Sequence, residues 1–484
     1  MKVIKNIIYQ SLNNILLAIL PLITVPYVSR ILGPSLLGIY SFSYTVVYYF
    51  VMIAGLGTVT YGSREIAAVQ HDETERNRVF WEIYLLRVFI TVIVYAIFLI
   101  FNFLIFDKSM RIFYLIQSIM IASVLLDISW LFIGMEDFKK ILFRNILVKG
   151  FSVIAIFIFV HQESDLWKYI FINASQFFVG NITFWPSIRK YVGKIQIKKK
   201  NFKHHFINTV FLFIPTIASQ TYLLINKNMI GVISGVTELG FYDQSDKVMR
   251  IVVSLVTSIG VALMPRTANL FARNELNKVN SFFFQSLDAV SGISFGVAFG
   301  LAAVSTKFSI LFFGPEYASV GTLLINQAPL IIILAMQNVV GNQYLIATKQ
   351  NRSFIIATVL TCVINIMSNL ILIPLFGNHG AIIGSILAEV IGLIYMLIVI
   401  NKNISISSHI QSLWKYILCA TSMFIPVYYL NIKMSSSIKS IVIQVIIGVF
   451  IYCTLNFVFK TKLALLIKKQ ILKKFNNYEK KEKK

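Results

Sequence analysis

The feature that most constrains this chain is an almost unbroken series of apolar runs, each about 20 residues long and able to cross a hydrocarbon core of ~30 Å. We count about fourteen, and they start near residues 7, 36, 81, 110, 141, 166, 206, 248, 281, 317, 354, 379, 411 and 437. Hydrophobic residues make up 57% of the chain and charged residues only 13%, which excludes a soluble globule. Because lipid cannot satisfy exposed backbone groups, the pattern predicts an all-α polytopic membrane protein.

The basic residues predict how the chain is oriented. The net charge is +24, and roughly 32 of the 44 Lys and Arg residues fall in segments that are cytoplasmic if the N-terminus is cytoplasmic. This asymmetry follows the positive-inside rule and predicts that both termini lie in the cytoplasm. The first apolar run is too long for a removable signal peptide, so we expect it to be the first span. The basic excess therefore reports orientation, and nucleic-acid binding is not predicted.

The chain repeats part of its own outline. Leu37-Gly38-Ile39-Tyr40 is echoed by Leu239-Gly240-Phe241-Tyr242, and the step from Gly38 to Gly240 has the same length, 202 residues, as the step from Arg64 to Arg266. A repeat of this kind in a membrane chain predicts two lobes with a transported substrate between them.

The repeat suggests a division of the chain into five parts. They are an N-terminal lobe over residues 1–195 (spans one to six), a basic cytoplasmic linker over 196–205, a C-terminal lobe over 206–400 (spans seven to twelve), two extra spans over 401–460, and a basic cytoplasmic tail over 461–484. We expect the tail to rest against anionic lipid head groups.

Ionisable side chains inside the spans are functional hypotheses by default, because charges are costly within a bilayer. The acidic ones are Asp127, Asp243, Asp246, Asp288 and Glu389. The basic ones are Arg30, Arg87, Lys227, Lys247 and Arg250, with Arg64 and Arg266 at the inner ends of spans two and eight. Two interpretations stay open. The cations either line a positively charged cavity, or they snorkel to the interface and form private salt bridges with the acids.

No pattern in the sequence predicts catalysis, a cofactor or a metal site. Cys362, Cys419 and Cys453 all fall inside apolar spans, and the one histidine pair, His204-His205, lies in the basic central segment. There is no glycine-rich phosphate loop, zinc-protease pattern or nucleophile elbow. Gly292, Gly296 and Gly300 form a small-residue stripe that predicts helix packing.

Several motifs together resemble one family. The stretch from Pro21 to Gly33, followed by Leu37 to Tyr40, resembles the opening signature of the polysaccharide transporters, the Wzx-type O-antigen and capsule flippases. The segment from Asp127 to Trp130, with Gly134 to Phe138, is similar to the family's fourth-span motif. Pro374 to Gly377, with Gly380-Ala381 and Glu389, resembles its turn between spans eleven and twelve.

This resemblance implies the fold of the multidrug/oligosaccharidyl-lipid/polysaccharide exporter superfamily, with two six-helix lobes and alternating access. It also implies a substrate: an undecaprenyl-diphosphate-linked sugar repeat unit, moved from the inner to the outer leaflet of the cytoplasmic membrane. Membrane lipids, a polysaccharide polymerase and chain-length machinery are the implied partners. A lipid II flippase and a multidrug cation exporter are the alternatives, and the embedded cations argue against the second.

A diphosphate substrate gives the embedded residues expected roles. We expect substrate to be bound by Arg30, Arg64, Arg87, Lys227, Lys247, Arg250 and Arg266. We expect Asp127 and Glu389 to act in ion coupling or gating. Arg64 and Arg266 should flank the cytoplasmic mouth of the cavity, unless they only anchor helix ends at the interface.

Overall fold

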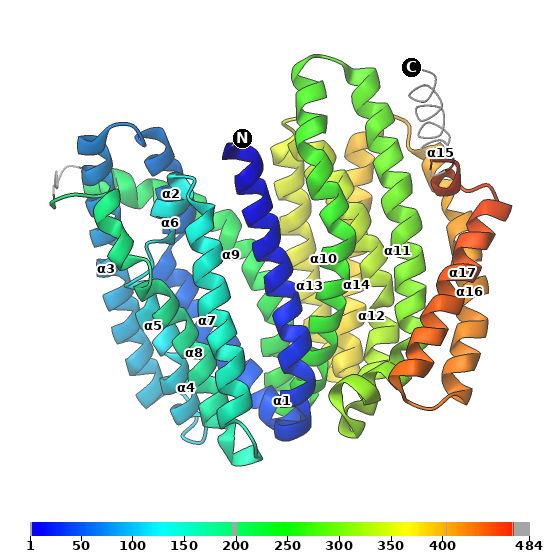
Figure 1. The fold of residues 1–484 in the computed structure, drawn as a ribbon, viewed down its shortest axis with the longest axis horizontal. Helices are drawn as coiled ribbons and strands as arrows, with labels where there is room; N and C mark the ends of the chain where they lie inside the picture. The colour runs from blue at the N-terminus through cyan, green and yellow to red at the C-terminus, as the bar shows by residue number, and fades with distance from the viewer. Residues whose placement is uncertain (1, 196–200, 403, 467, 469–484) are drawn as a thin grey trace, which may run out of the picture. The chain divides into compact units, whose positions relative to one another are not determined.

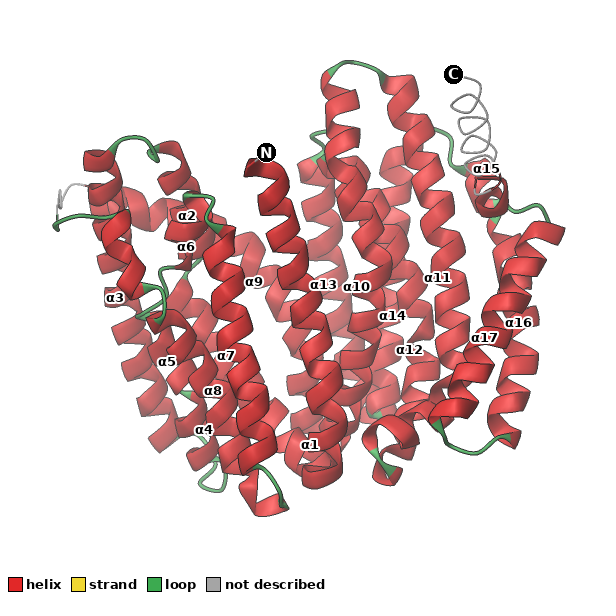
Figure 2. Ribbon diagram, in the orientation of Figure 1, coloured by secondary structure: helices red, strands yellow, loops and turns green. Residues whose placement is uncertain are grey.

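The structure is a computed structural model that describes residues 2–195, 201–402, 404–466 and 468. Within these residues every regular element is a helix (Figure 2). Part of the predicted linker over 196–205, and most of the predicted tail over 461–484, lie outside the described residues.

Backbone contacts divide the chain into two compact units, residues 1–240 and residues 241–484. Helix α9 packs against α1, α2 and α3 and groups with unit 1. The predicted division into two lobes, with a boundary near residue 195, stays a prediction. The helices of unit 1 are α1 (Lys2–Gly55), α2 (Thr58–Ala68), α3 (Glu73–Leu104), α4 (Arg111–Gln117), α5 (Ile119–Val124), α6 (Ser129–Gly134), α7 (Phe138–Phe159), η1 (Glu163–Asp165), α8 (Leu166–Ile182), η2 (Trp185–Lys190) and α9 (Phe202–Ile233), labelled in part in Figure 1.

Unit 2 begins within α10, because the first residues of this helix, 236–240, belong to unit 1. Its long central helix α11 packs against α12, α16 and α17. The elements are α10 (Val236–Ala272), α11 (Leu276–Phe313), η4 (Pro315–Tyr317), α12 (Ala318–Gln337), the π-helical segment η5 (Asn338–Ile346), α13 (Asn351–Phe376), α14 (Asn378–Asn401), α15 (Ser407–Ile410), α16 (Leu413–Lys433) and α17 (Ile438–Val458).

The described residues contain ten helical stretches that are long and apolar enough to cross a membrane, and two shorter apolar ones, Arg111–Val124 and Leu224–Ile233. Large apolar side chains lie on their outer faces: Phe89 is 64% exposed and Leu104 77%. Such surfaces suit contact with lipid.

The element α1 consists of two helices that meet at Gly33, where the backbone is not helical. Gly33 has a φ of 68°, in the left-handed region that glycine adopts without steric cost, and Pro34 follows it. The sequence predicts two separate spans here, and the structure has two helices that meet at this glycine.

The repeated Leu-Gly-aromatic step forms a close backbone contact within unit 1. A Cβ atom on Gly38 would lie 1.7 Å from the carbonyl oxygen of Val236, and one on Gly240 would lie 1.9 Å from that of Pro34. No side chain fits at either position, so glycine is required at both. The two copies of the motif therefore face each other, α1 against the first turn of α10.

The predicted packing role of the glycine stripe on α11 is confirmed at two of its three members. A Cβ on Gly292 would lie 2.6 Å from the Leu463 side chain, and one on Gly296 would lie 2.6 Å from the Tyr452 ring. The Tyr452 hydroxyl also donates to the Gly292 carbonyl at 2.6 Å. Small residues thus let α17 approach α11 closely.

Candidate substrate-binding residues

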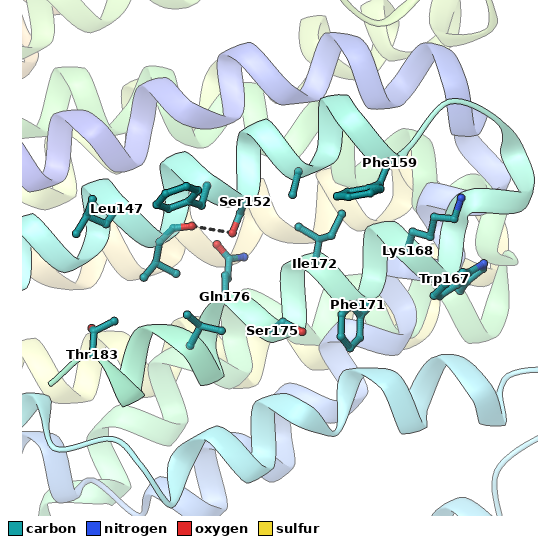
Figure 3. Close-up of a pocket in the computed structure, with 14 residues that line it drawn as sticks. Leu147, Ser152, Phe159, Trp167, Lys168, Phe171, Ile172, Ser175, Gln176 and Thr183 are labelled. Carbon is teal, nitrogen blue, oxygen red and sulfur yellow. Dashed lines mark hydrogen bonds between the residues drawn. The ribbon is translucent and has the colours of Figure 1, made fainter. Parts of the chain in front are cut away.

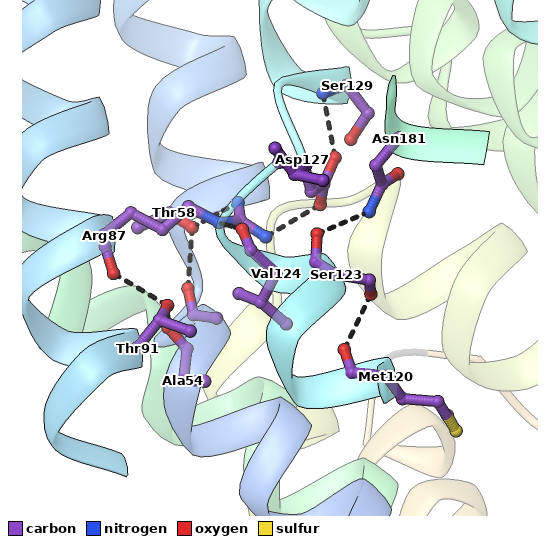
Figure 4. A network of polar contacts seen from close by, with 12 residues as sticks. Ala54, Thr58, Arg87, Thr91, Met120, Ser123, Val124, Asp127, Ser129 and Asn181 are labelled. Atoms are coloured by element: carbon purple, nitrogen blue, oxygen red, sulfur yellow. Dashed lines mark hydrogen bonds and ion pairs between the residues drawn. The ribbon is translucent and has the colours of Figure 1, made fainter. Parts of the chain in front are cut away.

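Arg87 is held deep inside unit 1 by a network that Figure 4 shows. The residue is 2% exposed. Its Nη2 lies 2.7 Å from Oδ2 of Asp127, its Nη1 donates to Thr58 Oγ1 at 2.7 Å, and its Nε donates to the Val124 carbonyl at 2.9 Å. Every arm of the guanidinium is therefore engaged, and the side chain ties α2 and α3 to the turn after α5.

Asp127 lies in the turn between α5 and α6, and its second oxygen accepts from the Ser129 backbone N–H at 2.9 Å. The acid is thus fixed from both sides, by an arginine and by the start of α6. The structure places Asp127 in a salt bridge with an embedded cation, one of the two interpretations that the sequence leaves open. A role of Asp127 in ion coupling stays a prediction.

Lys247 and Arg250 form ion pairs within α10. Lys247 Nζ lies 2.7 Å from Asp243 Oδ2, and Arg250 Nε lies 2.8 Å from Asp246 Oδ2. In both pairs the acid lies one turn before the cation, the favourable order in a helix. Both acids are buried, whereas the Lys247 and Arg250 side chains are 30% and 41% exposed. Each pair is close to neutral, so it attracts an anion less than a lone cation would.

Arg64 and Arg266 differ from these paired cations. Both are exposed, on α2 and α10, and neither forms an ion pair among the described residues. The Arg266 guanidinium lies over the Phe282 ring of α11, 4.7 Å from its centroid. An arginine stacked in this way keeps its N–H donors available at the ring's edge.

The other three predicted residues occupy different surroundings. Arg30 is exposed on α1, and Lys227 is partly buried on α9 between two asparagines, of which Asn228 accepts from Thr45 Oγ1 at 2.9 Å. Glu389 is 3% exposed on α14, and its backbone carbonyl accepts from Gln337 at 2.7 Å. Arg30, Arg64, Arg87 and Lys227 belong to unit 1, and Lys247, Arg250 and Arg266 to unit 2. A single cavity shared by all seven stays a prediction.

The sequence analysis missed a basic pocket between α7 and α8. The Arg144 guanidinium donates to the Gly180 carbonyl at 3.0 Å and to Asn181 Oδ1 at 2.9 Å, and Lys149 lies one turn further along α7. Both line a cavity of about 220 Å³. The signal in the sequence is a charge within an apolar run, but Arg144 and Lys149 lie close in sequence to Lys139 and Lys140, so the pattern groups all four as one basic cluster at the end of a span.

An apolar groove adjoins this pocket and shares Val148 and Gln176 with it. Figure 3 shows its residues on the two helices. The groove has a volume of about 690 Å³, and its wall is almost entirely carbon; Lys168 and Trp167 stand at one end. An apolar groove open on the outside of a membrane helix pair suits a hydrocarbon chain.

Comparison with known proteins gives a consistent result. Residues 3–271, more than half of the chain, match a family described as polysaccharide biosynthesis protein. A protein of Escherichia coli (strain K12) named "Putative O-antigen transporter" is 26% identical over 72% of this chain and 85% of its own length. A protein of the same name from Shigella dysenteriae is 23% identical over 66% of this chain and 80% of its own length.

Solved structures share the fold. The lipid II flippase MurJ, in an inward closed conformation, has a TM-score of 0.78 and 17% identity, over 94% of this chain and 98% of its own. A multidrug resistance MATE family transporter of the MOP superfamily, in an inward-facing conformation, has a TM-score of 0.61 and 12% identity, over 79% of this chain and 95% of its own. The predicted exporter-superfamily fold is confirmed. These matches together indicate a membrane transporter and not an enzyme. The chain belongs to the polysaccharide biosynthesis protein family.

Proposed function

We propose that this protein is a flippase that moves undecaprenyl-diphosphate-linked oligosaccharide repeat units from the inner to the outer leaflet of the cytoplasmic membrane by alternating access. The observation that carries this proposal is the similarity, over most of the chain, to two proteins named as O-antigen transporters. The fold supports it, because the membrane-length helices, ten of them among the described residues, can enclose a polar head group while a polyprenyl tail stays in lipid.

The distribution of charge supports an anionic head group. Three embedded cations are neutralised by their own acids: Arg87 by Asp127, Lys247 by Asp243 and Arg250 by Asp246. Arg64 and Arg266 have no such acid among the described residues, and they occupy equivalent places in the two halves of the repeat. A guanidinium binds phosphate through two parallel hydrogen bonds, so these two residues suit the first contact with a diphosphate.

The membrane potential favours the proposed direction of transport. A diphosphate carries about two negative charges. Moving each of them outward across a membrane that is negative inside releases ~2.3 kcal/mol per 100 mV. The sugars need only a polar path, since neutral hydroxyls cost far less to move than charges. In this scheme both termini lie in the cytoplasm, and Arg30 and Lys227 complete the substrate-binding set.

The experiment is delivery of lipid-linked sugar to the outer leaflet in a bacterium that lacks its own O-antigen transporter and expresses this chain or a variant. With Arg64 and Arg266 both changed to alanine, we expect delivery at matched protein abundance to fall at least about tenfold, because charge-assisted bonds to the diphosphate are lost. Delivery by the Arg266→Lys variant should fall less, since lysine keeps the charge but cannot form the two parallel hydrogen bonds of a guanidinium.

The matched control is Arg352→Ala, which removes an exposed arginine at the start of α13. Its delivery should equal that of the unchanged protein. Normal delivery by the Arg64→Ala, Arg266→Ala double variant would rule out these two residues as the capture site.

A lipid II flippase is the competing function, and its supporting observation is the fold shared with MurJ. Both substrates carry a polyprenyl diphosphate, so the proposed capture site serves either one. They differ in the attached sugars and peptide. Rescue of a strain depleted of its lipid II flippase would favour this second function.

A further inference from the structure

The basic pocket between α7 and α8 carries positive charge that no acid neutralises within the described part of the chain. Arg144 and Lys149 both line it, and neither forms an ion pair there. The acid whose charge acts on Arg144 is Asp127, and that carboxylate is already paired with Arg87 at 2.7 Å. The pocket therefore differs from the sites of Arg87, Lys247 and Arg250, each of which has an acid of its own.

Neutral groups hold Arg144 in place and leave part of its guanidinium available. The side chain donates from Nε to the Gly180 carbonyl at 3.0 Å and from Nη2 to Asn181 Oδ1 at 2.9 Å. Its Nη1 donates to Asn145 Oδ1 at 3.3 Å. A Cβ on Gly180 would lie 2.6 Å from Nη2, so glycine is what lets the guanidinium approach α8 this closely. An arginine has five N–H donors, and two of them remain for a ligand.

Lys149 has no hydrogen bond or ion pair among the described residues, and it is partly buried. It lies eleven residues after Phe138, about 16 Å along a helix of 22 residues. A lysine charge this far inside an apolar span is costly without a counter-ion. The ammonium either extends towards the membrane surface or binds an anion in the pocket.

The apolar groove continues from this pocket without a break, because Val148 and Gln176 line both cavities. Figure 3 shows Gln176 beside Ser152, between the two helices. The stretch of α7 that lines the groove, Leu147 to Phe159, is about 18 Å long by the rise of a helix. One leaflet of hydrocarbon is ~15 Å deep, so the groove has room for one extended acyl chain.

The two ends of the groove differ in charge. At the far end, Lys168 Nζ lies 2.6 Å from Asp165 Oδ1, so this cation already has its acid. The end that adjoins the basic pocket has two cations and no such acid among the described residues. Electrostatics therefore favours an anionic head group at the Arg144 end and not at the Lys168 end.

We propose that the basic pocket and the apolar groove together form a binding site for one anionic phospholipid. Arg144 and Lys149 bind its phosphate, and one of its acyl chains lies in the groove between α7 and α8. The chain alone gains little, since the surrounding lipid is as apolar as the groove, so the head group decides which lipid binds. A zwitterionic phospholipid carries its own cation beside the phosphate and gains less from these two side chains.

Such a lipid contacts both helices and stabilises their packing, because it binds only the folded protein. The site is separate from the proposed substrate-binding set, none of whose members lines the pocket or the groove. The inference therefore does not rest on the proposed function.

The test is lipid binding by the full-length protein in a neutral detergent. The protein is titrated with phosphatidylglycerol or with phosphatidylcholine of the same acyl chains, and native mass spectrometry measures the fraction with one bound lipid. We expect phosphatidylglycerol to bind at least about tenfold more tightly than phosphatidylcholine, and Lys149→Gln to remove most of this difference, because a charge-assisted contact to the phosphate is lost. Lys149 is the residue to change, since Arg144 also makes structural hydrogen bonds.

The matched control is Lys168→Gln, which removes the cation at the far end of the groove and should leave the affinity for phosphatidylglycerol unchanged. A second variant, Ala155→Phe, places a ring in the groove and keeps both cations of the pocket. It should weaken binding of phosphatidylglycerol as well, which tests the acyl-chain part of the site separately.

Equal affinity of the unchanged protein and Lys149→Gln for phosphatidylglycerol would overturn the proposal, and so would a loss in Lys168→Gln alone. Glycerol 3-phosphate, which has no acyl chain, should not displace the bound lipid at the same concentration. If it does, the pocket binds a free anion and the groove has no part in it. Stronger displacement by undecaprenyl phosphate would assign the site to a polyprenyl lipid and contradict the phospholipid assignment. Transport is not measured, so failure here leaves the proposed function untouched.

Discussion

Several embedded cations of this protein form ion pairs with acidic residues of the same unit. Arg87 and Asp127 show the principle most clearly, because the arginine is nearly inaccessible and all of its bonds lie within unit 1. A pair of this kind adds little net stability, because desolvation offsets the attraction. Losing one partner is costly, however, since the remaining charge stays buried.

We therefore expect Arg87→Met to destabilise the protein by about 3–5 kcal/mol, because Asp127 loses its counter-ion. The double variant Arg87→Met, Asp127→Asn should recover part of this loss, because no buried charge remains. Chemical denaturation in detergent measures both. Equal stability of Arg87→Met and the unchanged protein would show that Asp127 does not depend on this arginine.

For single residues, the sequence predicts which side chains are important more successfully than it predicts which residues they contact. The pairs Asp243–Lys247 and Asp246–Arg250 are four residues apart and can be read from the helical period. Arg87 and Asp127 both stand out as embedded charges, but their pairing joins segments 40 residues apart. His205 shows the same limit, because its Nε2 lies 2.9 Å from Glu82 Oε2 on another helix, and a contact between distant helices leaves no local pattern.

Among the elements, the contact between α1 and the start of α10 is the most demanding. The repeat was visible in the sequence as two Leu-Gly-aromatic steps. That the two copies touch was not, since nothing local in a sequence states which helix crosses which. The π-helical segment after α12 was also unpredicted, because its composition is that of an ordinary apolar helix.

Substitution of Gly38 tests this contact. In Gly38→Ala the new methyl group meets the Val236 backbone, which cannot move aside as a side chain would. We expect a loss of about 1–3 kcal/mol or more. The matched control is Gly150→Ala in α7, where a Cβ meets nothing within 4 Å. That change should stabilise by about 1 kcal/mol through helix propensity. Comparable midpoints for the two variants would contradict the close crossing.

For the whole molecule, the apolar composition of the chain is the most informative feature of the sequence. The apolar runs predict an all-helical membrane protein, and the fold shared with MurJ confirms that fold class. The orientation rests on the positive-inside rule, and the fold does not determine it.

Single cysteines test the orientation in a variant whose Cys362, Cys419 and Cys453 are alanine. Lys190→Cys, at the end of η2, should react with an impermeant thiol reagent only when the cytoplasmic face is open. Lys108→Cys, in the turn before α4, should react in intact cells. Labelling of position 190 from outside would show that the topology is the reverse of the predicted one, and that the proposed capture site faces the other side of the membrane.

The most direct test of the central claim is translocation by the purified protein in liposomes that contain an undecaprenyl-diphosphate-linked oligosaccharide. The measurement is the fraction of sugar that an impermeant glycosidase cleaves, in vesicles with and without protein. We expect the protein to move the oligosaccharide that is initially protected inside the vesicles to the outer leaflet, where the glycosidase cleaves it. Lipid II, tested in parallel, should stay in its original leaflet. A protein that moves lipid II as fast, or does not move the oligosaccharide, would contradict the account.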